Sequence, residues 1–126
     1  MQVGGVPSRI ISCGNTQQLY DAAIELWSSD EKFHVLAGGS NTVFAEDLAD
    51  LTIVHVTNRG VEIVSEDAQV VVVRVQAGHS WDEFVAWSVA NDYAGMEAMS
   101  GIPGSVGATP VQNVGGYGQE VSDVIT

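Results

Sequence analysis

Residues 101–118 read GIPGSVGATPVQNVGGYG and form the most glycine-rich segment of the chain. Six of the 14 glycines in the 126 residues lie in it. Glycine at this density weakens helices and strands, because its backbone loses more entropy on ordering than that of other residues. A stretch this long without regular structure is uncommon in a compact domain unless it has a function. We therefore expect a loop whose main chain approaches another molecule closely.

On the N-terminal side of this segment, apolar residues predict the strands of an α/β-type chain. Strands are expected at 9–12, 34–37, 51–56, 61–64 and 70–77. The last of these carries the strongest pattern, because it is rich in valine and its residues alternate between two faces. On the C-terminal side, residues 120–126 predict the opening of a further strand.

Two helices are expected where apolar residues recur at steps of three and four. The first spans 17–27 after an N-cap at Asn15 or Thr16. Its apolar face comprises Leu19, Ala22, Ala23, Leu26 and Trp27. The second opens at 80–83 with a capping box, a serine followed three residues later by a glutamate, and ends near 91–92. Its inward side chains are expected to be Trp81, Phe84, Val85, Ser88 and Val89.

Composition and charge exclude several classes of function. The chain has 16 acidic and 4 basic residues, for a formal charge of -12. Four scattered cations cannot form the positive surface that nucleic acid requires, and an anionic membrane surface is disfavoured for the same reason. No apolar run approaches the roughly 20 residues of a membrane span, and no signal-peptide pattern is visible. The single cysteine, Cys13, fits a reducing compartment, so we expect a cytoplasmic protein.

A second glycine segment, AGGSN at 37–41, directly follows a predicted strand. Two adjacent glycines allow successive main-chain N–H groups to point into one concavity, and such nests bind phosphate without Lys or Arg. Ser40 and Asn41 add side-chain donors. The segment matches neither the dinucleotide fingerprint nor the P-loop, because no lysine follows. An ordinary glycine turn is the alternative, and this segment alone favours it.

The chemistry that residues 101–118 suggest is the binding of a flat, partly polar ring together with a phosphate. Glycine and small residues alternate there with Ile and Val, which places bare main-chain donors beside apolar contacts. A packed glycine-rich crossover is the alternative. The two glycine segments together favour the ligand-binding interpretation.

No other residues form a convincing catalytic or metal site. The three histidines have no metal-ligand spacing with one another or with Cys13. The carboxylates at 82–83 belong to a helix start, where they complement the helix dipole. Ser105 lacks the strand-to-helix turn of a nucleophile elbow. We therefore predict no catalytic residue and no metal ligand in this chain.

Three segments together resemble one enzyme family. AGGSN after a strand, VQAGHSW at a helix start and GMEAMSGIPGSVGATPVQNVGGYGQEVSD are similar, in this order, to the UDP-N-acetylenolpyruvoylglucosamine reductases, also called UDP-N-acetylmuramate dehydrogenases. The similarity covers essentially the whole chain, and the GIPGSVGATPVQNVGGYG block is its most specific part. The usual Asn-Thr pair before the first glycines is absent. The family commonly has Gly-Ala-Tyr-Gly at 115–118, and some members have serine in place of Ala108.

The resemblance implies an α+β protein with the FAD-binding fold of the vanillyl-alcohol oxidase or PCMH type. Residues 1–60 would form a first α/β subdomain and 61–126 the N-terminal part of a second, incomplete one, with the substrate-binding domain absent. The 38–41 loop would hold the FAD pyrophosphate, and the second block would line the pyrophosphate and the isoalloxazine, with Val111 and Val114 against the ring. The implied cofactor-binding residues are Gly38, Gly39, Ser40, Asn41, Gly101, Ile102, Pro103, Gly104, Ser105, Val106, Gly107, Ala108, Thr109, Val111, Asn113, Val114, Gly115, Gly116, Tyr117 and Gly118.

The resemblance also implies an oxidoreductase of peptidoglycan precursor synthesis, hence of cell wall biogenesis, cell shape and cell division. NADPH would reduce FAD, and the flavin would pass hydride to UDP-N-acetylglucosamine enolpyruvate, giving UDP-N-acetylmuramate. The family's catalytic arginine, glutamate and serine lie in motifs downstream of the matched segment, and none of these motifs is found before Thr126. We interpret the chain as a piece of a larger flavoprotein that is inactive alone; a complete small domain is the alternative.

Two other functions stay open. One is another flavin oxidoreductase of the same fold. Many such oxidases attach FAD through a histidine near the pyrophosphate loop, and no histidine lies at 38–41 or soon after. The other is a stand-alone flavin- or nucleotide-binding module without catalytic activity.

Overall fold

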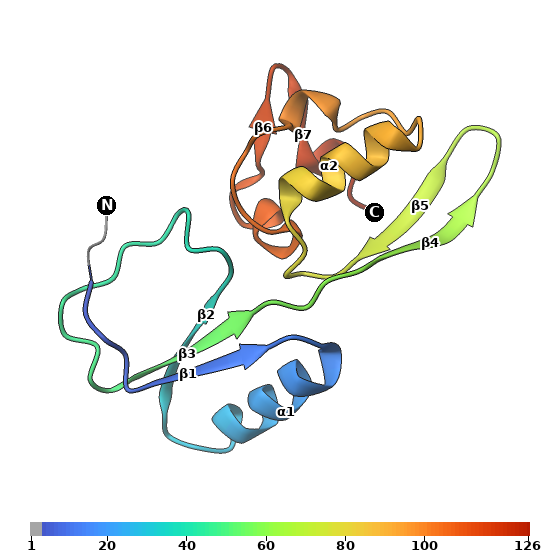
Figure 1. Cartoon of the computed structure of the whole chain (residues 1–126). Helices are drawn as coiled ribbons and strands as arrows, with labels where there is room; N and C mark the ends of the chain where they lie inside the picture. Colours follow the sequence, from blue (N-terminus) through green and yellow to red (C-terminus); the bar gives the residue numbers. More distant parts are fainter. Residues whose placement is uncertain (1–3) are drawn as a thin grey trace. The chain divides into compact units, whose positions relative to one another are not determined.

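The computed structural model describes residues 4–126, and its contacts divide the chain into two compact units, Met1–Asn58 and Arg59–Thr126 (Figure 1). Each unit combines helices with strands, as the predicted α+β class requires. None of the helices in residues 4–126 is long and apolar enough to cross a membrane.

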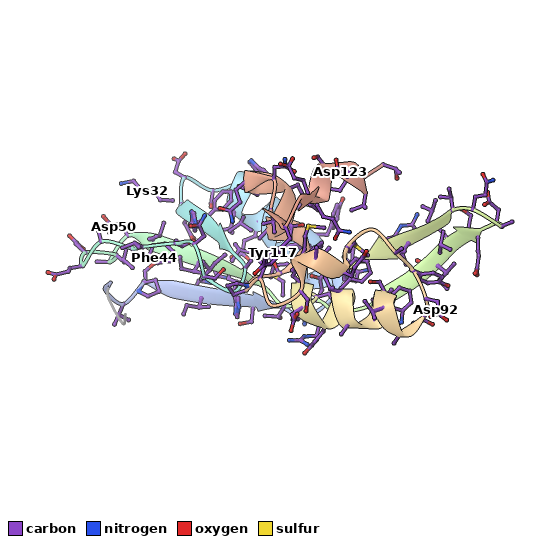
Figure 2. All side chains as sticks on the ribbon, turned by 90° about the horizontal axis from the view of Figure 1, so that it is seen from above. Lys32, Phe44, Asp50, Asp92, Tyr117 and Asp123 are labelled. Carbon is purple, nitrogen blue, oxygen red and sulfur yellow. The ribbon has the colours of Figure 1, made fainter. Side chains whose placement is uncertain are left out.

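The first unit is a three-stranded parallel sheet with one helix on it (Figure 1). The strands are β1 (Arg9–Cys13), β2 (Lys32–Leu36) and β3 (Leu51–Val56), in the order β1-β3-β2. The helix, α1 (Thr16–Trp27), forms the crossover from β1 to β2 that parallel strands need. Strand β3 is the most buried because it has a neighbour on each edge. Lys32 marks the beginning of β2 (Figure 2).

Helix α1 begins as the sequence predicts, with Asn15 as the N-cap. The Asn15 side-chain oxygen accepts from the N–H of Gln18 at 2.9 Å, and the Gln18 side chain accepts from the N–H of Gly14 at 2.8 Å. The first bond satisfies a donor that a helix start otherwise leaves free, and the second ties the residue before the N-cap to the first turn. The residues buried between α1 and the sheet are Cys13, Ala22, Leu26 and Val54.

The second unit opens with a hairpin and a helix. Strands β4 (Val61–Glu66) and β5 (Val71–Val75) pair antiparallel, with a bulge between Ile63 and Ser65. Helix α2 (Trp81–Ala90) follows, with Ser80 as its N-cap. The core of the unit comprises Trp81, Phe84, Val85, Met96, Met99 and Val121.

Short elements fill the glycine-rich part of the second unit, where the sequence predicts no regular structure. Three are 3-10 helices: η1 (Glu97–Met99), η2 (Val106–Gln112) and η3 (Val121–Asp123). Between η2 and η3, two-residue strands β6 (Gly115–Gly116) and β7 (Gln119–Glu120) form a small hairpin.

The prediction of a strand at 120–126 is wrong. The chain leaves β7 at Glu120 and turns at once into η3. Glu120 and Asp123 cause the turn, because each side chain accepts a hydrogen bond from the main chain of the other. The Asp123 carboxylate accepts from the Glu120 N–H at 3.1 Å. Such local bonds compete with extended backbone and favour a turn.

Three details of the helices also differ from prediction. The Ser80 hydroxyl accepts from the Glu83 N–H at 3.4 Å, but the Glu83 carboxylate accepts from Arg59 at 2.7 Å rather than from the main chain of Ser80. The predicted capping box is therefore only half formed. Trp27 and Val89, expected to face inward, are 76% and 52% exposed, and each lies in the last turn of its helix.

Candidate cofactor-binding segments

The loop at 38–41 presents open main chain at the carboxyl end of β2. All four of its residues are exposed. Gly39 has φ +71°, a conformation that favours glycine, whereas Gly38 has no positive φ. A β-carbon at Gly38 would meet nothing within 4 Å. Neither backbone conformation nor internal packing therefore requires glycine at Gly38, and a close approach by another molecule would explain it. The carboxyl ends of parallel strands are where ligands of α/β sheets bind.

The first turn of the second glycine segment is held against the start of α2. Gly101 and Gly104 have φ values of +78° and +138°. The Asp82 carboxylate accepts from the Gly101 N–H at 2.6 Å and from the Ser100 hydroxyl at 3.0 Å. The Trp81 N–H donates to the Gly104 carbonyl at 3.1 Å. These donors, the Gly101 N–H first and the Ser100 hydroxyl second, lower the pKa of Asp82.

Contacts within the chain explain why three positions of the same segment are glycine. A β-carbon at Gly107 would lie 2.6 Å from the β-carbon of Ala77. One at Gly115 or Gly116 would lie 2.9 or 3.2 Å from a main-chain oxygen. Real β-carbons make no contacts as short as the first two, so packing accounts for these glycines without a ligand. Gly101 and Gly118 differ, because a β-carbon at either would meet nothing within 4 Å.

The two valines expected against one ring do not share an exposed surface. Val111 is 86% exposed, whereas Val114 is 9% exposed. The Val114 N–H donates to the Thr109 carbonyl at 3.0 Å, and its carbonyl accepts from the Val121 N–H at 2.8 Å. Val114 therefore connects η2 to η3, and Val111 is the one of the pair that another molecule can reach.

Asn113 is committed to its own turn. Its amide nitrogen donates to the Glu120 carboxylate at 2.7 Å, and its amide oxygen accepts from the Ser122 N–H at 3.0 Å. Its φ of +48° ends η2. Tyr117 lies in the turn between β6 and β7 with its side chain 99% exposed (Figure 2). The structure gives Asn113 a structural role and leaves Tyr117 available for contact.

Two buried polar atoms near the second segment lack hydrogen-bond partners within residues 4–126: Ser105 Oγ and His79 Nδ1. The two residues are neighbours in space, because the Val106 N–H donates to the His79 carbonyl at 2.9 Å. Buried polar atoms without partners carry a free-energy cost. From the sequence, His79 has no assigned role, although it lies in the VQAGHSW segment, and Asp82 is assigned to the helix dipole alone. The hydrogen bond between Asp82 and Gly101 joins residues 19 positions apart, so local sequence patterns do not reveal it.

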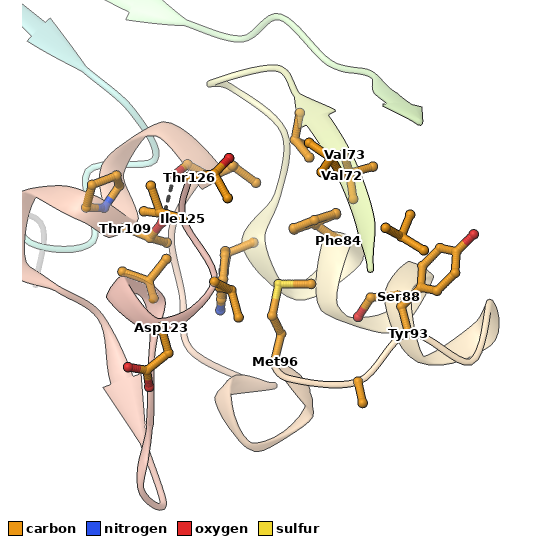
Figure 3. A pocket seen from close by; sticks show the side chains of 18 of the residues that line it. Val72, Val73, Phe84, Ser88, Tyr93, Met96, Thr109, Asp123, Ile125 and Thr126 are labelled. Carbon is orange, nitrogen blue, oxygen red and sulfur yellow. Dashed lines mark hydrogen bonds between the residues drawn. The ribbon is translucent and has the colours of Figure 1, made fainter. Parts of the chain in front are cut away.

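An apolar groove of about 610 Å³ lies in the second unit (Figure 3). Phe84, Ser88 and Met96 form one wall, and valines of β5 form another. Of the predicted cofactor residues, Val106, Gly107 and Thr109 line it. Its volume falls within the range of small-molecule pockets. Its lining is mainly apolar, so the groove suits an apolar occupant. Among residues 4–126, no three His, Cys, Asp or Glu side chains gather as a metal site would require.

Comparison with known proteins identifies the class of protein. The model of the FAD binding domain family matches residues 7–126, and the chain belongs to this family. The match indicates the PCMH-type FAD-binding fold, as the sequence predicted.

Curated relatives that match the chain over its whole length share one enzyme name. The chain is 45% identical over 125 residues to the UDP-N-acetylenolpyruvoylglucosamine reductase of Leifsonia xyli, covering 99% of the chain and 33% of that protein. It is 45% identical to the enzyme of Salinispora arenicola, covering 100% and 35%, and 46% identical to that of Mycolicibacterium smegmatis, covering 100% and 33%. The resemblance to this family is thus confirmed, and the chain spans about a third of the length of the curated relatives it matches.

Proposed function

We propose that this chain binds FAD as the cofactor-binding portion of a cytoplasmic, NADPH-dependent reductase. The reductase would convert UDP-N-acetylglucosamine enolpyruvate to UDP-N-acetylmuramate for the cell wall. Membership of the FAD binding domain family and the name shared by the relatives support this proposal. In it, residues 1–60 and 61–126 belong to two FAD-binding subdomains, and the substrate binds outside residues 1–126.

The observation that carries the proposal is the open glycine at Gly38. It is exposed, and a β-carbon there would meet nothing within 4 Å. With Gly39, it offers main-chain donors without a positive charge, and Ser40 and Asn41 complete the exposed loop. This chemistry fits a pyrophosphate, because N–H groups in a nest bind anions directly. The residues present therefore fit FAD, because main-chain N–H groups can bind its pyrophosphate even in a chain whose formal charge is -12.

The second segment would hold the same cofactor through apolar contacts and bare main chain. Gly101 and Gly118 leave their surroundings open, and Val111 and Tyr117 are exposed. Within the proposal, the predicted residues from 101 to 118 that are accessible contact the cofactor, and the buried ones support them. When bound, FAD would supply the hydride chemistry, and this chain would bind and orient it.

A titration of the purified chain with FAD tests the proposal, with flavin fluorescence and visible absorption as readouts. Saturable binding is expected for the wild type. Gly38→Val should abolish it, because the side chain would occupy the space that the pyrophosphate needs, while circular dichroism stays unchanged. Ala49→Val is the matched control, since it enlarges another exposed loop residue of the same unit. Equal FAD binding by Gly38→Val and the wild type would contradict the loop assignment.

A stand-alone flavin-binding module is the alternative function. The remaining two thirds of the Salinispora arenicola enzyme, supplied as a separate polypeptide, distinguish the two functions. Substrate-dependent NADPH oxidation by the mixture supports the reductase. FAD binding without such oxidation favours the module.

A further inference from the structure

Asp82 joins the first turn of α2 to the second glycine segment. Its side-chain oxygen Oδ1 accepts two hydrogen bonds from residues 18 and 19 positions away, the Ser100 hydroxyl at 3.0 Å and the Gly101 N–H at 2.6 Å. The helix is capped without it, because Ser80 accepts from the Glu83 N–H. Asp82 is thus free to bind the loop instead of the helix end.

Asp82 holds the glycine end of this turn. Gly101 adopts φ +78°, and the space beside it is open, so no side-chain packing fixes its conformation. Ile102, the next residue, packs against the core of the unit. The far end of the turn is held by the Trp81 N–H, which donates to the Gly104 carbonyl. Two adjacent residues of α2 therefore hold both ends of the turn.

We propose that Asp82 is a positioning residue for the cofactor, holding the main chain at 100–101 in the conformation that receives FAD. This role rests on the proposed function. It is indirect, because a carboxylate placed directly against a pyrophosphate would repel it. A charged acceptor also forms stronger hydrogen bonds than a neutral one, which suits Gly101, whose conformation no neighbouring side chain fixes.

Three variants of the full chain test the role. Asp82→Ala removes the acceptor, and FAD affinity should fall at least about tenfold, the size expected for losing a hydrogen bond to a charged group. Asp82→Asn keeps an acceptor oxygen and should recover part of the affinity. Glu83→Ala is the matched control, because it removes a carboxylate from the same helix turn and leaves the loop untouched. It should bind FAD within about threefold of the wild type.

Hydrogen exchange without FAD supplies a readout that a general loss of stability would not give. The peptide containing Gly101 should exchange faster in Asp82→Ala than in the wild type or Glu83→Ala, while α1 peptides stay unchanged. If Asp82→Ala does not fold, Ser100→Ala removes one of the two bonds and should show a smaller loss in the same direction.

The outcomes separate the two proposals. A folded wild-type chain that binds no FAD overturns the proposed function and the positioning role with it. Wild-type binding that survives unchanged in Asp82→Ala overturns the positioning role alone. Equal losses in Asp82→Ala and Glu83→Ala also overturn it, since helix charge would then explain both.

Discussion

Replacing Trp81 by phenylalanine tests how the core of the second unit is built. Trp81 is 2% exposed, and its indole N–H donates to the Met99 carbonyl at 3.0 Å. Its ring also packs edge-on against Phe84, with centroids 6.1 Å apart. Phenylalanine keeps an aromatic ring there but removes the donor and part of the volume. The Met99 carbonyl then loses this partner in a buried place.

The magnitude follows from these two losses. A buried carbonyl left unsatisfied costs about 1–3 kcal/mol. The smaller ring adds roughly 1 kcal/mol for lost packing. The free energy of unfolding should therefore fall by about 2–4 kcal/mol, against a total of about 5–15 kcal/mol for an ordinary domain. The variant should fold but unfold at a clearly lower urea concentration.

Urea denaturation followed by circular dichroism measures this change. Trp27→Phe is the control, because Trp27 is 76% exposed and contacts Phe33 by its ring edge. It should change stability by no more than about 0.5 kcal/mol. Equal losses in the two variants, or a loss below about 1 kcal/mol for Trp81→Phe, would refute the reasoning.

Three further predictions concern packing, reactivity and pH. Gly107→Ala should destabilise the chain by about 1–3 kcal/mol in the same urea assay, because its β-carbon would overlap that of Ala77, whereas Gly38→Ala should change stability little. Cys13 is fully buried and burial raises the pKa of its thiol, so a thiol reagent should label it only after denaturation; rapid labelling of the native chain would contradict this. Two main-chain N–H groups lower the pKa of Asp67 below its ordinary value of 3.8. The stabilisation of the folded state by the Asp67 carboxylate should therefore be complete above about pH 4 and decline as the pH falls through the folded-state pKa. The stability difference between the wild type and Asp67→Ala should then shrink in acid, and a difference that grows in acid would show the sign to be wrong.

Local signals predicted much of the fold. Strand β3 spans the residues that the pattern indicates, and Asn15 caps α1 as its side chain and position suggest. The end of α2 falls at Ala90, beside the predicted boundary. These features depend on residues within a few positions of one another, and periodicity and capping chemistry report such interactions directly.

The glycine-rich part could not be predicted in the same way. Proline inside η2 argues against a helix, yet Val106–Gln112 forms a 3-10 helix. The family resemblance assigned every glycine there to the cofactor-binding site. Only contacts distant in sequence separate Gly107, which packs on Ala77, from Gly101, which faces open space. The anchoring role of Asp82 depends on such a contact too.

The edge of β5 has a consequence for solubility. Within residues 4–126, β5 pairs with β4 alone, so its other edge can template pairing with another chain. Four successive valines, from Val70 to Val73, form the start of β5 and the residue before it. Segments of this composition aggregate readily. Arg74 interrupts the run with a charge exposed at the surface and paired with Glu62 at 3.2 Å. An exposed charge at such a place opposes the stacking of further strands, which is the effect of gatekeeper residues beside apolar strands.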